Sequence, residues 1–133
     1  MKKILLDTNA YIGYLTGDKN VLDFLATADV VYISVFVAGE LYAGFRGGSK
    51  YRQNKELFER FLQKMTVELL AATEVTADIF GQLKDTLKRA GTPVPINDVW
   101  IASHAIETGS VLITYDRHFA RLPGLRLWYH FPE

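Results

Sequence analysis

The chain has 133 residues, of which 49% are hydrophobic and 23% charged, so it is expected to fold as a single domain, 1–133, with its own core. It contains no cysteine, which excludes disulfides, thiolate zinc sites and cysteine nucleophiles and predicts a reducing, cytoplasmic location. Basic and acidic residues number 15 each, and a net charge of zero argues against strong nonspecific binding to duplex DNA.

The first third of the chain alternates predicted strands and helices. The opening apolar run ends at Asp7, too early for a signal peptide, and no later run approaches the ~20 residues of a membrane span. Hydrophobic patterning predicts a strand at 4–6, a helix with Tyr11, Ile12 and Leu15 facing inward, a helix at 21–28, a strand at 30–33, and a helix from 35 to about 45 capped by Ser34.

The rest of the chain continues this alternation after a break at Gly47–Ser49. The predicted elements are a helix at 51–64, a strand at 66–70, a helix at 73–90 stopped by Gly91, a helix capped by Asn97 that runs to 108, a strand at 111–114, a short helix at 116–122 and a strand at 125–129. Such alternation predicts an α/β fold with a central, mostly parallel sheet flanked by helices. Ligands bind such sheets at the carboxyl ends of the strands.

Four acidic residues stand at predicted strand ends or inside apolar segments. They are Asp7 in KILLDTN, Glu40 in VFVAGELYAG, Asp98 in PINDVWIA and Asp116 in VLITYDRHF. Burying an unpaired carboxylate costs several kcal/mol, so four such acids suggest a shared purpose. The simplest purpose is to bind a hard divalent cation such as Mg²⁺, which points to phosphate chemistry.

Each acid also has a structural explanation. Asp7 and Asp116 could cap helices, and Asp98 could favour a helix dipole. Glu40 is harder to explain in this way, because the nearly apolar segment around it predicts a helix buried on most sides, and a functional role outweighs an exposed stripe. Asn9 could cap the first helix or position a metal-bound water.

Other chemical signatures are weak. The histidines at 104, 118 and 130 share no metal-ligand spacing, so they are interpreted as structural or surface residues, and of them only His118 lies near a proposed site. There is no GxGxxG, no GxxxxGK[ST] and no GxSxG. The basic run from Arg46 to Lys64 is typical of a solvated helix face, although it could also steer a polyanion.

Together, the segments LLDTNAYIGYL, SVFVAGELYAG, PINDVWIASHAIETG and LITYDRHFARLPGLRL resemble the PIN-domain ribonucleases, most closely their VapC-type toxins. The resemblance implies a three-layer PIN-like fold and a catalytic, metal-binding set of four acids, namely Asp7, Glu40, Asp98 and Asp116. It implies Mg²⁺ or Mn²⁺ as cofactor and Asn9 and Thr114 as supporting groups. Tyr115 departs from the family pattern, in which a polar residue is common at this position.

By this resemblance, the chain is expected to be the endoribonuclease toxin of a type II toxin–antitoxin module, cleaving tRNA or rRNA by in-line attack of metal-activated water. The implied partners are the RNA, an antitoxin that blocks the acidic pocket, and a second copy in a homodimer. Arg46, Lys50 and Arg52 are candidates for gripping the RNA backbone. The aromatic residues Tyr42, Phe45 and Tyr51 are candidates for an interface or for ordinary core packing.

Two other functions stay open. One is a non-catalytic PIN-like scaffold that binds RNA or protein, against which the presence of all four acids argues. The other is a metal-dependent phosphohydrolase acting on small molecules. An enzyme of that kind that works through a phospho-aspartate usually carries a second acid near its nucleophile, and position 9 is Asn.

Overall fold

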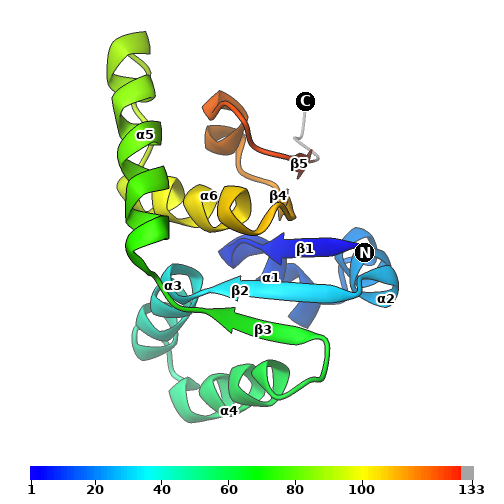
Figure 1. Ribbon diagram of the computed structural model, residues 1–133. Coiled ribbons are helices and arrows are strands. Elements are labelled where there is room, and N and C mark those ends of the chain that lie inside the picture. Colours follow the sequence, from blue (N-terminus) through cyan, green and yellow to red (C-terminus); the bar gives the residue numbers. More distant parts are fainter. Residues whose placement is uncertain (130–133) are drawn as a thin grey trace.

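Five parallel strands form the centre of the fold, in the order β3-β2-β1-β4-β5 (Figure 1). This computed structural model describes residues 1–129, so His130 lies outside the described part. The elements are β1 (Lys3–Leu6), α1 (Thr8–Leu15), α2 (Lys19–Thr27), β2 (Val30–Ser34), α3 (Val35–Arg46), α4 (Tyr51–Leu62), β3 (Val67–Leu70), α5 (Glu74–Ala90), α6 (Ile96–Thr108), β4 (Val111–Thr114), the 3₁₀ helix η1 (Arg117–Arg121) and β5 (Leu127–Tyr129). The predicted α/β class is confirmed, and each strand pair is parallel.

Helices cover both faces of this sheet. The chain moves from β1 through β2 to β3 in one direction, then returns to β4 and β5 on the other side of β1. Right-handed crossovers therefore place α1–α4 on one face and α5 and α6 on the other. Between them lies β1, whose Ile4, Leu5 and Leu6 are completely buried. This arrangement is the three-layer fold that the resemblance implies.

An aromatic cluster joins the helices of the first face. The ring of Tyr11 lies 5.1 Å from the rings of both Phe58 and Phe61, edge to face, and all three side chains are buried. Phe45 also packs into this cluster and is 6% exposed, while Tyr42 and Tyr51 are half-buried. Core packing, one of the two alternatives that the sequence left open, therefore accounts for Phe45.

Several local predictions are wrong in detail. Ile12 and Leu15 were expected inward but are 40% and 38% exposed, because the short helix α1 presents Ala10 and Tyr11 to the core instead. Asn97 does not cap α6. The helix begins earlier, with Pro95 at the N-cap, and the Asn97 amide lies 3.5 Å from the Phe36 carbonyl oxygen.

Buried His104 connects three segments around α6. Its Nδ1 lies 2.7 Å from the Ser34 hydroxyl, which also caps α3, and its Nε2 lies 3.1 Å from the Ala71 carbonyl oxygen. A neutral ring that donates from Nε2 and accepts at Nδ1 satisfies both partners. Burial lowers the pKa of His104 below its usual 6.5.

Replacing His104 by Ala is expected to lower the free energy of unfolding by about 2–5 kcal/mol, because it leaves a cavity and two unpaired buried groups. Because the native pKa is lowered, the stability that wild-type His104 contributes is present above pH 6.5 and lost as the pH falls below it. Urea unfolding of both proteins from pH 5 to 8 tests this. If the difference in unfolding free energy between wild type and His104→Ala increased as the pH fell, this prediction would be wrong.

Within residues 1–129, no helix is both long enough and apolar enough to cross a membrane.

Candidate functional site

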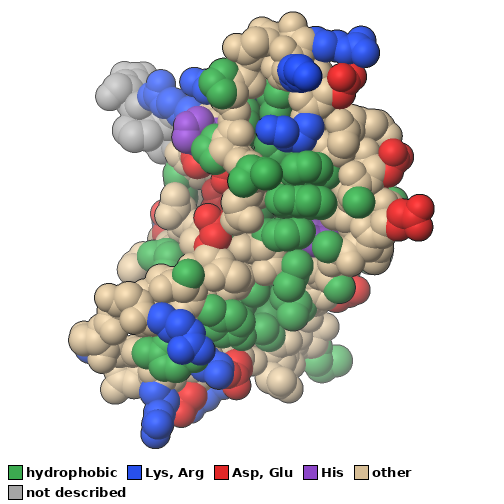
Figure 2. All heavy atoms as spheres, turned by 90° about the vertical axis from the view of Figure 1, so that its left-hand side faces the viewer, with side chains coloured by type: hydrophobic (Ala, Val, Ile, Leu, Met, Phe, Trp, Pro, Cys, Tyr) green, Lys and Arg blue, Asp and Glu red, His purple; other side chains and the backbone are tan. Residues whose placement is uncertain are grey.

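The four predicted acids lie around one pocket at the carboxyl edge of the sheet. Asp7 follows β1, and its backbone N–H donates to the carbonyl of Ile113 in the neighbouring strand β4, just before Asp116. Glu40 comes from α3 and Asp98 from the first turn of α6. The pocket has a volume of about 130 Å³ and is lined by Asp7, Thr8, Asn9, Glu40, Asp98, Ile101, Asp116 and Phe119. Figure 2 faces this edge and shows acidic side chains recessed in a hollow.

Asp7 is held by hydrogen bonds to both carboxylate oxygens and is only 3% exposed. One carboxylate oxygen accepts from the Ala10 amide at 2.8 Å, which caps α1, and the other accepts from the Thr114 hydroxyl. The same hydroxyl accepts from the Asp116 amide at 2.8 Å, so Thr114 joins both acids. Burial raises the pKa of Asp7 to about 6, reinforced by the charges of Asp116 and Asp98 and opposed by these hydrogen bonds.

Asp98 has a similar electrostatic environment. Its side chain is 14% exposed, and burial is the main cause that raises its pKa to about 6. The nearby charges of Asp116 and Glu40 raise this pKa further, while His118 lowers it. Burial and mutual repulsion disfavour the ionised form of these carboxylates, so a bound cation would stabilise them.

Glu40 does not lie in a buried helix as the sequence suggested. It belongs to an exposed stripe of α3 with Gly39, Ala43 and Gly44, whose small side chains made the segment look apolar. Its Oε1 accepts a hydrogen bond from the Thr8 hydroxyl at 2.6 Å. The argument from burial is therefore wrong for Glu40, although the residue does line the acidic pocket.

The predicted RNA-contacting residues lie outside the pocket, at the end of α3 and the start of α4. The Arg46 guanidinium stacks 4.6 Å from the ring of Tyr51, and Lys50 and Arg52 line a shallow hollow beside that ring. Asn9, by contrast, lines the acidic pocket and is exposed.

His118 belongs to the site, which the interpretation as a structural or surface residue missed. Its Nδ1 lies 3.0 Å from Asp116 Oδ1 and 3.5 Å from Asp98 Oδ2. The spacing Asp-x-His at a predicted turn was the available signal, because one tight turn brings residues two apart together. This arrangement differs from the metal-ligand spacing of two histidines on one helix.

These donors fit a divalent cation. One ligand atom from each of Asp98, Asp116 and His118 lies within 4.8 Å of the others, and the carboxylates of Asp7 and Glu40 line the same pocket. Carboxylate oxygens are the ligands of Mg²⁺ and Mn²⁺ in proteins.

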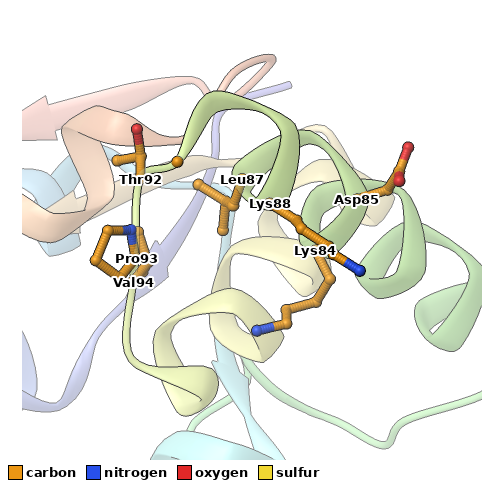
Figure 3. Close-up of a pocket in the computed structure, with 8 residues that line it drawn as sticks. Lys84, Asp85, Leu87, Lys88, Thr92, Pro93 and Val94 are labelled. Atoms are coloured by element: carbon orange, nitrogen blue, oxygen red, sulfur yellow. The ribbon is translucent and has the colours of Figure 1, made fainter.

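Two other hollows differ from this pocket in chemistry. The larger has about 510 Å³ and lies between α5 and the loop before α6, where Figure 3 shows Lys84 and Lys88 along the helix across from Thr92 and Pro93. It holds no cluster of acids. The second is a groove of about 310 Å³ that shares Thr8 and Glu40 with the acidic pocket and is otherwise lined by Ile12, Leu15, Leu41, Gly44, Phe45 and Asn54.

Comparisons with known proteins agree with one another. Residues 4–125 match the model of the PIN domain. Ribonuclease VapC1 of Haemophilus influenzae (strain R2866) is 30% identical over 92% of this chain and 93% of its own length. The tRNA(fMet)-specific endonuclease VapC of Salmonella typhimurium is 32% identical over 96% of this chain and 97% of its own length. A chain of VapBC-1 from nontypeable Haemophilus influenzae superposes with a TM-score of 0.84 at 30% identity, covering 96% of this chain and 97% of that one.

Proposed function

This chain belongs to the PIN domain family, and we propose that it is a VapC-type endoribonuclease, the toxin of a type II toxin–antitoxin pair, that cleaves structured RNA in the cytoplasm. The observation that carries the proposal is the convergence of four carboxylates at one sheet edge, with Asp7 buried among them. A tRNA or rRNA is the proposed substrate, since one relative is named as a tRNA endonuclease.

The proposed catalytic residues are Asp7, Glu40, Asp98 and Asp116, which would hold Mg²⁺ or Mn²⁺. When bound, the cation would supply positive charge next to the scissile phosphate and would lower the pKa of a bound water. Thr114 fixes the orientation of Asp7, and Thr8 keeps Glu40 turned toward the pocket. Asn9 is proposed to orient the water.

A groove next to the pocket suits the antitoxin. Ile12 and Leu15 are partly exposed there, and Glu40 lies on its boundary with the acidic pocket. An antitoxin segment with an apolar side and a basic end would fill the groove and neutralise the acids at once. The structural likeness to VapBC-1 supports such a partner.

A second copy is the proposed partner of the apolar face beside the acidic hollow (Figure 2). Where α3, α5 and α6 meet, Trp100 is stacked between Phe36 and Phe80, with ring centres 4.9 and 3.7 Å away, while Ile96 at the start of α6 is 61% exposed. A homodimer formed through this face would bury the exposed apolar area, which favours association.

Lys50 and Arg52 are proposed to contact RNA phosphates, so replacing either by Ala should raise the KM for RNA and leave kcat unchanged. Each substitution should also reduce the slope of log affinity against log salt by about 1. Binding and single-turnover cleavage at several salt concentrations measure both effects. Lys88→Ala, on the exposed end of α5, is the control, and an equal effect there would contradict the assignment.

The deciding experiment is cleavage of total tRNA and rRNA by purified, antitoxin-free protein with Mg²⁺ or Mn²⁺, beside EDTA and Asp7→Asn controls. Discrete fragments that disappear in both controls are expected. A parallel assay with small phosphate esters tests the phosphohydrolase alternative. A folded, metal-loaded protein that bound RNA but cleaved neither substrate would favour the scaffold.

A further inference from the structure

The imidazole of His118 turns one ring nitrogen toward Asp98 and Asp116, two of the acids that line the pocket. The backbone N–H of His118 donates to Asp116 Oδ1 at 2.9 Å, which folds the first turn of η1 back toward the acids. The side chain as a whole is 43% exposed, yet its Nδ1 atom is buried. This nitrogen has no well-aligned hydrogen-bond partner, although it lies within ion-pair distance of Asp98 and Asp116.

Burying a nitrogen without a well-aligned hydrogen-bond partner costs free energy, and so does the repulsion between two neighbouring carboxylates. The separations of His118 from the two acids are close to those between ligands of one metal ion. Ligands on adjacent corners of an octahedron with bonds of about 2.1 Å lie about 3 Å apart. The observed separations from His118 Nδ1 are 3.0 Å to Asp116 and 3.5 Å to Asp98. One cation among them would satisfy all three groups.

We infer that His118 Nδ1 is a ligand of the divalent cation, together with Asp98 and Asp116, and that this nitrogen makes the site prefer Mn²⁺ to Mg²⁺. Mg²⁺ binds almost exclusively to oxygen, whereas imidazole nitrogen suits transition-metal ions. The inference rests on the proposed function, since it assigns a ligand within the same cation site. It adds a selectivity that carboxylates alone do not supply.

Two other roles for His118 make different predictions. As a permanent imidazolium, the ring would neutralise the acids and compete with any cation, so its removal would strengthen binding of both ions. As a donor of a proton to the leaving group, it would affect cleavage without affecting cation affinity. Only a role as ligand predicts that removing the nitrogen weakens Mn²⁺ binding more than Mg²⁺ binding.

The test is calorimetric titration of the metal-free full-length chain with MnCl₂ and with MgCl₂, in the absence of RNA. His118→Ala is expected to weaken Mn²⁺ binding at least about tenfold and Mg²⁺ binding less than about threefold. His118→Gln is the second variant, in case the alanine variant does not fold. Asp85→Asn, an exposed acid on α5, is the control for incidental carboxylate binding.

Pulsed electron paramagnetic resonance of bound Mn²⁺ gives an independent readout. A nitrogen coupling from a coordinated imidazole is expected in the wild-type protein and not in either His118 variant. A coupling that persists in the variants, or equal weakening of both ions, would overturn the inference while leaving the cation site intact. Wild-type protein that bound neither ion would overturn the inference and the metal-dependent function together.

Discussion

Replacing Asp7 by Asn is expected to lower the rate of RNA cleavage by about a thousandfold or more, because losing one charged ligand removes several kcal/mol of transition-state stabilisation. Asp7 is the most buried of the four acids and follows β1, where its backbone N–H donates to the Ile113 carbonyl of β4. Asparagine keeps its size and can still accept the hydrogen bond from Ala10, so α1 remains capped. Single-turnover cleavage with saturating Mn²⁺ measures the loss.

The control is Asp85→Asn, the same chemical change at an exposed position on α5. This variant should cleave like the wild type. Circular dichroism of both variants separates a chemical defect from unfolding. If Asp7→Asn protein were folded and cleaved RNA within about tenfold of the wild-type rate, Asp7 would not bind the cation that activates the water.

Asp98→Asn is expected to stabilise the metal-free protein and raise its melting temperature at pH 7. Burial and the charges of Asp116 and Glu40 raise the pKa of Asp98 to about 6, so its ionised form is disfavoured in the folded state. Removing the charge relieves this repulsion. It also favours ionisation of Asp7, because the charge of Asp98 raises the pKa of Asp7. Thermal unfolding in EDTA measures the shift.

The pH dependence of stability follows from the same acids. Their pKa values in the folded protein are about 6 against an ordinary 3.8, so the folded state binds more protons between these values. Metal-free wild-type protein should therefore gain stability from these groups as the pH falls through 6 toward 4, by about 3 kcal/mol from Asp7. The opposing effect of His104 is common to wild type and Asp98→Asn, so it cancels in their difference.

Adding Mn²⁺ should reverse the ranking of the two proteins. The cation stabilises the wild type by binding only its folded state, and it stabilises the variant less because one ligand is lost. Asp85→Asn should follow the wild type in both conditions. A lower melting temperature for Asp98→Asn in EDTA would show that the carboxylate is satisfied without metal.

Local sequence patterns were enough to predict the sheet and two of the acids. Strands of β-branched and leucine residues alternate with helices, and Asp7 and Asp116 follow two of these strands at the points where chain direction changes. The local sequence also predicted the helix cap at Ser34 correctly. The cap predicted at Asn97 was wrong, because Pro95 is the N-cap and the helix begins at Ile96. Glu40 was predicted as a site residue because its helix was expected to be buried. The residue lines the pocket, but its side chain is exposed.

The sequence by itself determined the order of the elements and the acids at the strand ends, because these follow from patterns within a few residues, and the alternation of strands with helices predicted the parallel sheet. Only the tertiary structure decided that β4 lies beside β1 and that α3 and α6 meet above them, which brings Glu40 and Asp98 to Asp7 and Asp116. It also decided the role of His118, since a ring nitrogen becomes a candidate ligand only when a turn places it against distant carboxylates. Convergence of this kind is set by long-range packing, which hydrophobic periodicity does not encode.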